Sequence, residues 1–157
     1  MFAGAPREQY RAVTPQPRSL LIADDSPEMR YLLRRLCAHA FTDIHECGDG
    51  VEAVALFAAR QPDAVLMDIA MPRQDGLAAT ARIRAHSPTA RVIIVSQHDD
   101  ASFRQAAAQA GATAFVSKLD LQPLRQLLGL KHGATHAPSS DEPQPPIPGA
   151  PSPPTKL

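Results

Sequence analysis

Four short apolar runs in this chain each end directly on a polar or charged residue. The runs are too short for a typical helix, and several are rich in valine and isoleucine, which favours buried β-strands. In an open parallel sheet the carboxyl ends of the strands line the ligand crevice. We therefore expect these polar residues to meet at one edge of a sheet. They are Asp24 and Asp25 after residues 20–23, Asp68 after 64–67, Ser96 after 92–95, and Lys118 after 114–117.

Strand-like and helix-like segments alternate through the middle of the chain. Ser26 is a suitable N-cap followed by Pro27 at a first helical position, Asp49 can cap a second helix, and Gly111 can end a later one. The alternation predicts an α/β fold, a doubly wound parallel sheet of five strands with five helices and right-handed crossovers. Strands are predicted over 19–23, 43–47, 63–67, 91–95 and 112–116, and helices over 27–40, 50–60, 76–86, 101–110 and 119–130.

The 157 residues suggest one folded domain, which we place at residues 18–130, with a different composition on either side. Residues 1–17 carry three prolines and are predicted to be a short flexible leader. Eight of the twenty residues from Pro138 to Leu157 are proline, so we expect a disordered tail over 131–157. A solvated tail is the simpler interpretation, and docking of polyproline II segments on an aromatic groove of a partner is the alternative.

Charge and hydropathy exclude some classes of protein. The 16 basic and 16 acidic residues balance, which argues against a DNA binder driven by charge. No apolar signal core begins the chain, and no apolar run has the length needed to span a bilayer, so we expect a cytoplasmic protein. Cys37 and Cys47 have no metal-type spacing and are interpreted as reduced structural thiols.

The polar residues at the strand ends suit one kind of chemistry. Carboxylates held close together repel one another, so they either raise a pKa or recruit a cation. Mg²⁺ prefers oxygen ligands, which Asp24 and Asp25 can provide. Asp68 can then attack phosphorus as a nucleophile, giving an acyl phosphate. Lys118 supplies a second positive charge, and the Ser96 hydroxyl can donate to a phosphoryl oxygen.

Residues 18–130 resemble a receiver domain of the two-component response-regulator family. The matched segments are Asp24 through Arg30, Asp68 through Pro72 with Asp75-Gly76, Ser96, and Lys118. The resemblance implies a flavodoxin-like fold with strand order 2-1-3-4-5. It also implies that Asp68 accepts the phosphoryl group.

The resemblance further implies a ligand set for Mg²⁺, for which Mn²⁺ can substitute. Asp25 and Asp68 would bind the ion directly, Asp24 would assist through water, and the backbone carbonyl of Ala70 would complete the protein ligands. A carbonyl ligand makes no demand on the alanine side chain.

The resemblance also implies a switch between Ser96 and an aromatic residue on the fifth strand, here Phe115. The phosphoryl group on Asp68 would draw Ser96 inward, and Phe115 would turn into the vacated space. Many family members carry tyrosine at this position, so a hydroxyl available to their partners is absent here. We expect altered partner contacts as a result.

We expect a stand-alone response regulator, because the proline-rich tail is too short and too polar for a helix-turn-helix output domain. Residues 96–100 and 110–118 nevertheless resemble a branch whose members usually carry one. The expected partners are a sensor histidine kinase or a histidine phosphotransfer protein and a downstream protein target, with no DNA-binding domain and no membrane. A phosphorylation-dependent homodimer is a further expectation.

Two alternatives remain open at this point. The first is a receiver-like interaction module that works without phosphorylation, although Asp24, Asp25, Asp68 and Lys118 would then serve no purpose. The second is a phosphatase with an aspartyl nucleophile. Such enzymes usually place a second acid two residues after the nucleophile, where this chain has Ala70. We therefore expect no enzyme, only a protein that catalyses its own phosphorylation and dephosphorylation.

Overall fold

The computed structural model describes residues 18–130, so the predicted leader and tail lie outside it. Five strands and five helices alternate along these residues. The strands are β1 (Ser19–Ala23), β2 (Asp43–Cys47), β3 (Ala64–Met67), β4 (Val92–Ser96) and β5 (Ala114–Ser117). The helices are α1 (Pro27–Cys37), α2 (Gly50–Arg60), α3 (Gly76–His86), α4 (Ala101–Gln109) and α5 (Gln122–Leu128).

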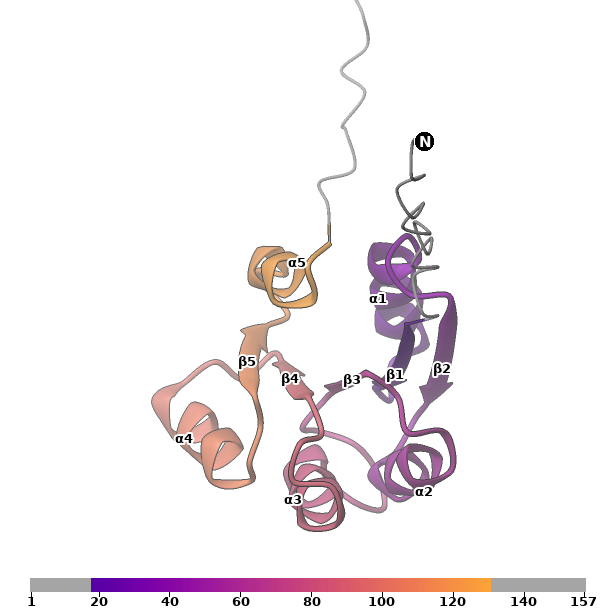
Figure 1. The fold of residues 1–157 in the computed structure, drawn as a ribbon. Coiled ribbons are helices and arrows are strands. Elements are labelled where there is room, and N and C mark those ends of the chain that lie inside the picture. Colours follow the sequence, from indigo (N-terminus) through magenta and orange to yellow (C-terminus); the bar gives the residue numbers. More distant parts are fainter. Residues whose placement is uncertain (1–17, 131–157) are drawn as a thin grey trace, which may run out of the picture.

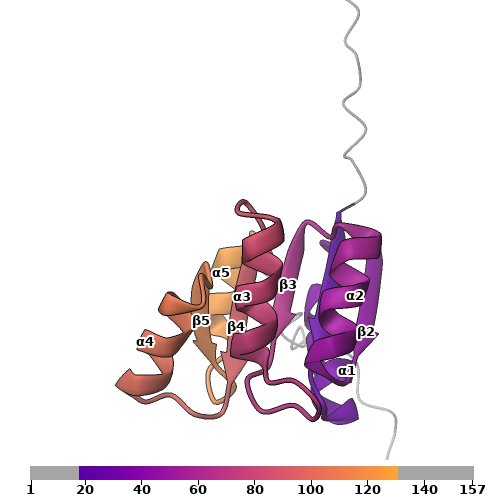
Figure 2. The same ribbon diagram turned by 90° about the horizontal axis from the view of Figure 1, so that it is seen from below.

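The strands form one parallel sheet in the order β2-β1-β3-β4-β5, between two layers of helices. Helices α1 and α5 cover one face of the sheet, and α2, α3 and α4 cover the other (Figure 1). Figure 2, seen from below, shows α4, α3 and α2 side by side across their face. The predicted fold class and strand order are therefore confirmed.

The core lies on both faces of the sheet, which explains why the central strands are apolar without interruption. Successive side chains of a strand point to opposite faces. Leu20 and Ile22 of β1 accordingly pack with Leu33 of α1, whereas Leu21 packs on the other side with Phe57 of α2. All five are buried, and full burial of a large apolar side chain contributes about 1.5–3 kcal/mol.

The predicted helix ends are confirmed at three positions. The Ser26 hydroxyl accepts a hydrogen bond from the Met29 N–H at 3.2 Å, and the Asp49 carboxylate accepts one from the Glu52 N–H at 2.9 Å. Each cap satisfies a free backbone donor and stabilises its helix by about 1 kcal/mol. Gly111 follows α4 with φ of +90°, a backbone conformation that favours glycine.

Three helices are shorter than predicted. Helix α4 ends at Gln109 rather than at residue 110, and α5 ends at Leu128 rather than at residue 130. Helix α1 ends at Cys37 rather than at residue 40, because the chain turns there and brings Phe41 into the core. Helix α5 begins at Gln122 rather than at residue 119. The chain first turns at residues 118–119, and Pro123 suits the first turn of the helix that follows.

Strand β2 lies at one edge of the sheet and carries charged side chains. Asp43 lies 3.1 Å from Nε2 of His45, and Glu46 forms an ion pair with Arg34 of α1. Within residues 18–130 the longest helices have 11 residues, about half the length that a membrane span requires.

Candidate functional site

Three carboxylates converge at the carboxyl edge of the sheet. Asp24 and Asp25 follow β1 and Asp68 follows β3, and these two strands pair directly through Ala23 and Met67. One oxygen from each carboxylate lies within 4.8 Å of the others. Asp24 and Asp68 are buried, whereas Asp25 is exposed. The convergence expected from the strand ends is therefore present.

Lys118 joins this cluster from the end of β5. Its Nζ lies 2.7 Å from Oδ2 of Asp24 and 3.2 Å from Oδ1 of Asp68, and only 8% of its side chain is exposed. Its backbone N–H donates to the Ser96 carbonyl at 2.8 Å, which ties the residue to the end of β4. Burial alone would lower the pKa of Lys118, but contact with Asp24 and Asp68 outweighs it and raises the pKa. The ammonium is therefore held in its charged form.

The site carries more negative than positive charge. Burial raises the pKa of Asp68, the Asp24 carboxylate raises it further, and Lys118 only partly opposes the increase. One ammonium faces three carboxylates. A further cation among these oxygens would therefore lower the electrostatic energy of the site.

Without a divalent cation, ionisation of Asp68 is expected to lower the free energy of unfolding as pH rises. Its pKa is higher in the folded chain than in the unfolded one. The stabilisation by the bound proton is therefore complete below the unfolded pKa of about 4 and is lost as pH rises through the folded pKa. Urea unfolding in the presence of a chelator measures this. The free energy of unfolding of Asp68→Asn, relative to that of wild type, should increase from about pH 4 to 8. A difference independent of pH would contradict this.

The donor set fits a hard divalent cation. Oδ1 of Asp24 accepts a hydrogen bond from the Ser26 N–H at 2.9 Å. Oδ2 of Asp24 is buried and lies 2.7 Å from Nζ of Lys118, whose single charge balances only one of the three carboxylates. Carboxylate oxygens are the ligands that Mg²⁺ prefers, so the cluster suits a further cation. Ala70 lies exposed in the bend after Asp68, and its part as a carbonyl ligand stays a prediction.

The two predicted switch residues have separate surroundings. Ser96 is buried at the end of β4, where its hydroxyl accepts a hydrogen bond from the His98 N–H at 3.1 Å. Phe115 on β5 is half-buried, and the guanidinium carbon of Arg104 lies 4.8 Å from its ring centroid. Phe115 pairs with Ile94 in the neighbouring strand. Their coupling through a phosphoryl group stays a prediction.

Three residues near the site make contacts that were not predicted from the sequence. Arg30 donates from Nη1 to the Asp24 carbonyl at 2.6 Å and so fixes the end of β1. Gly76 begins α3 against the backbone of Asp68, where no side chain fits. Arg104 covers Phe115. Gly76 belongs to the motif around Asp68, so the sequence did contain a signal for it. Arg104 lies on a predicted helix, and nothing in its sequence neighbourhood indicates the contact with Phe115.

Comparison with known proteins then decides the family. The model of the response regulator receiver domain matches residues 20–128, which is most of the chain. The chain belongs to this family. The resemblance drawn from the acidic pair, Asp68, Ser96 and Lys118 is thereby confirmed, and receiver domains are signalling modules.

This receiver domain is similar to proteins of different lengths. It is 36% identical to the chemotaxis protein CheY of Halobacterium salinarum, over 64% of this chain and 84% of that protein. It is 43% identical to protein-glutamate methylesterase/protein-glutamine glutaminase 4 of Myxococcus xanthus, over 65% of this chain but 30% of the relative. The chain thus spans less than a third of the second protein. The enzymatic activity in that name belongs to the relative.

Solved structures share the fold of this receiver domain. The CheX-CheY-BeF3-Mg+2 complex from Borrelia burgdorferi superposes with a TM-score of 0.64 at 30% identity, over 71% of this chain and 89% of that one. A LuxR-family response regulator from Aurantimonas sp. gives a TM-score of 0.66 at 30% identity, over 72% and 86% of the two chains. The BeF3 and Mg+2 belong to the Borrelia complex.

Proposed function

We propose that this receiver domain accepts a phosphoryl group on Asp68 and signals through contacts with other proteins. The observation that carries the proposal is the placement of Asp68 beside the Asp24 and Asp25 carboxylates and in contact with the Lys118 ammonium. The donor would be a sensor histidine kinase or a histidine phosphotransfer protein. The similarity to a chemotaxis protein over 84% of that protein's length supports signalling without an output domain.

The geometry supports a direct transfer. Lys118 contacts Oδ1 of Asp68, which leaves the other carboxylate oxygen to attack phosphorus while the bond from phosphorus to the donor breaks. The donor leaves with the electron pair of that bond, and Asp68 becomes an acyl phosphate. Lys118 then lies beside the phosphoryl group and offsets part of its charge.

Ser96 is suited to sense the product. Its hydroxyl oxygen accepts from the His98 N–H, and a hydroxyl also carries one proton to donate. The hydroxyl can therefore donate a hydrogen bond to a phosphoryl oxygen and keep the one that it accepts from His98. Movement of Ser96 would then pull on the loop that follows β4, and Phe115 would rotate beneath Arg104. The phosphorylated form is proposed to present a changed surface around α4 and β5, the face that a downstream target or a second copy would bind.

Asp24, Asp25 and Asp68 would hold Mg²⁺, with the Ala70 carbonyl as a further ligand and Mn²⁺ as a substitute. When bound, the ion supplies positive charge that shields the nucleophile from the approaching phosphoryl oxygens. Asp24 and Asp25 would hold that charge near Asp68, and Lys118 contacts both Asp24 and Asp68.

Magnesium is expected to stabilise the unphosphorylated protein. Binding to the folded state alone, at ten times the dissociation constant, raises the free energy of unfolding by about 1.4 kcal/mol. Urea unfolding with and without MgCl₂ measures this directly. The variant Asp25→Asn should lose most of the effect, whereas Asp43→Asn on the edge strand should keep it. Equal stabilisation of all three proteins would show that the ion binds elsewhere.

Intact mass tests the proposed function. The purified chain, incubated with a small acyl phosphate and Mg²⁺, should gain one phosphoryl group, and a chelator should prevent the gain. No gain under any condition would favour the interaction module that works without phosphorylation.

A further inference from the structure

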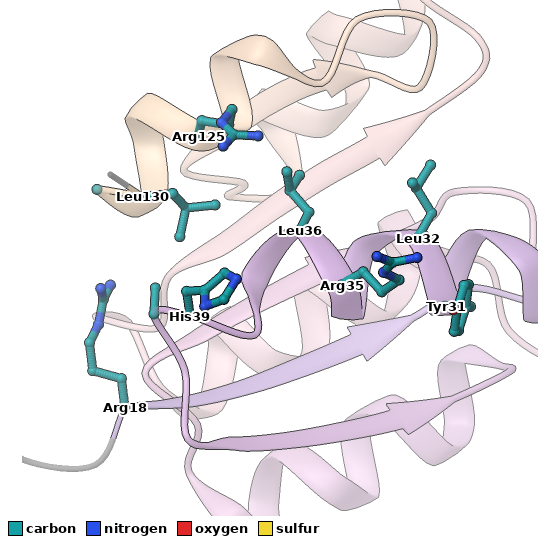
Figure 3. Close-up of a pocket in the computed structure, with 10 residues that line it drawn as sticks. Arg18, Tyr31, Leu32, Arg35, Leu36, His39, Arg125 and Leu130 are labelled. Carbon is teal, nitrogen blue, oxygen red and sulfur yellow. The ribbon is translucent and has the colours of Figure 1, made fainter. Parts of the chain in front are cut away.

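A groove of about 770 Å³ lies between α1 and α5, on the face of the sheet that these two helices cover. Figure 3 shows Leu32 and Leu36 of α1 along its length, with Arg125 of α5 opposite. Arg18 and Leu130 lie toward one end. The groove is separate from the acidic cluster, since Arg18 precedes β1 and the acidic pair follows it.

The groove is strongly cationic. Arg18, Arg35 and Arg125 line it, and no acidic residue in the described part of the chain does so. None of the three arginines forms an ion pair within residues 18–130. Arg18 instead donates to the Leu128 carbonyl at 3.2 Å. The groove therefore offers positive charge that the described residues do not neutralise.

Apolar surface accompanies this charge. Tyr31 is 61% exposed and Leu32 is 48% exposed on neighbouring positions of α1. The guanidinium carbon of Arg35 lies 5.8 Å from the centroid of the Tyr31 ring. Exposed aromatic rings in a groove are typical binding surfaces for proline-rich segments. The groove thus suits a ligand that combines carboxylates with proline.

The chain itself supplies such a segment. Arg18 and Leu130 are the first and last described residues and both line the groove, so the rest of the chain leaves from its rim. In residues 131–157 the acidic side chains are Asp141 and Glu142, and Pro-Gln-Pro-Pro-Ile-Pro follows them directly. Lys131 and Lys156 balance these acids over the whole of 131–157, but residues 141–148 contain no basic residue. Residues 1–17 carry two arginines and one glutamate, a net positive charge that does not match a cationic groove.

The length of the connection allows the contact. Ten residues separate Leu130 from Asp141, and a chain of that length spans up to about 33 Å. Helix α1, with 11 residues, is about 16 Å long. The acidic pair can therefore reach any point of the groove. Attachment to the same chain gives an effective concentration of about a millimolar for a short connection, so weak contacts suffice.

We propose that residues 141–148 of this chain bind in its own α1–α5 groove. Asp141 and Glu142 pair with the arginines, and the prolines that follow pack on Tyr31 and Leu32. The contact depends on charge and apolar surface alone, so it does not require phosphorylation of Asp68.

A spin label on the full chain tests the contact. Cys37 and Cys47 are buried, and burial raises the pKa of their thiols to about 11 and about 12, so a nitroxide reagent will select an added cysteine. The label is placed at Ser152→Cys, beyond the proposed contact. Amide resonances of Tyr31 and Gly129 should broaden strongly, whereas those of α3 on the opposite face should not.

Charge variants supply the controls. Replacing Asp141 with Asn and Glu142 with Gln in the labelled chain should lower the ratio of bound to free segment by about 2- to 30-fold, as expected for two exposed ion pairs. Arg35→Gln should also reduce the broadening, whereas Arg60→Gln on the opposite face should leave it unchanged. Sheet resonances that keep their positions will show that each variant is folded.

Two results would overturn the proposal. Broadening that is spread evenly over the domain, or that survives neutralisation of Asp141 and Glu142, would show that the segment does not bind the groove through these charges. If the label stays distant while an added acidic peptide shifts the groove resonances, the groove serves an acidic partner protein and not this chain.

Discussion

Asparagine in place of Asp68 is expected to leave the protein unable to acquire a phosphoryl group. The amide nitrogen and oxygen that replace the carboxylate are poor nucleophiles, so the acyl phosphate does not form. The change keeps the size of the side chain and removes one of the repelling charges beside Asp24. The variant should therefore remain folded, and its loss of phosphorylation will report the chemistry alone. Intact mass after incubation with the acyl phosphate donor is the measurement.

An ordinary surface aspartate provides the control. Asp43 is exposed on β2, and Asp43→Asn should be phosphorylated at the wild-type rate. If Asp68→Asn still gained a phosphoryl group, the modified residue would have to be found by peptide mapping, and the assignment of Asp68 would be wrong.

Alanine in place of Gly76 is expected to cause a large loss of stability. A Cβ atom there would lie 1.7 Å from the carbonyl oxygen of Asp68 and 2.7 Å from its carbonyl carbon. Both are backbone atoms, so the start of α3 must move away from β3. Overpacking of this kind costs about 3 kcal/mol, and the movement should also displace Asp68 and slow its phosphorylation. Urea unfolding and phosphorylation rate are the two measurements.

Gly48 offers a matched comparison. The nearest atom to a Cβ at this position is Nη1 of Arg30 at 3.7 Å, an ordinary contact with a flexible side chain. Gly48→Ala should therefore change the free energy of unfolding by no more than about 1 kcal/mol. Similar losses in the two variants would mean that the contact with the Asp68 backbone does not explain the effect at Gly76.

The sequence was sufficient to predict the fold because its local signals agree with one another. Continuous apolar runs indicated strands buried on both faces, and the polar residues that end them indicated the edge where Asp24, Asp68 and Lys118 meet. Caps such as Ser26 marked where helices begin. These features depend on neighbours in the chain, so they can be interpreted without the tertiary structure.

Features that depend on packing between distant elements could not be predicted in the same way. The position of Arg104 over Phe115 requires the relative placement of α4 and β5. The α1–α5 groove depends on how two helices at opposite ends of the domain lie together. The early end of α1 at Cys37 follows from the burial of Phe41, which its sequence neighbourhood does not reveal.

The charged edge strand β2 bears on how copies of this domain can meet. An open strand edge is a template on which another chain can add its own strand and begin aggregation. Asp43 and Glu46 place charge along this edge, and Glu46 is already paired with Arg34. An incoming strand would have to remove water from these groups. Growth of the sheet at β2 is therefore disfavoured, so copies are expected to associate through other surfaces, such as the face around α4 and β5 at the opposite edge of the sheet.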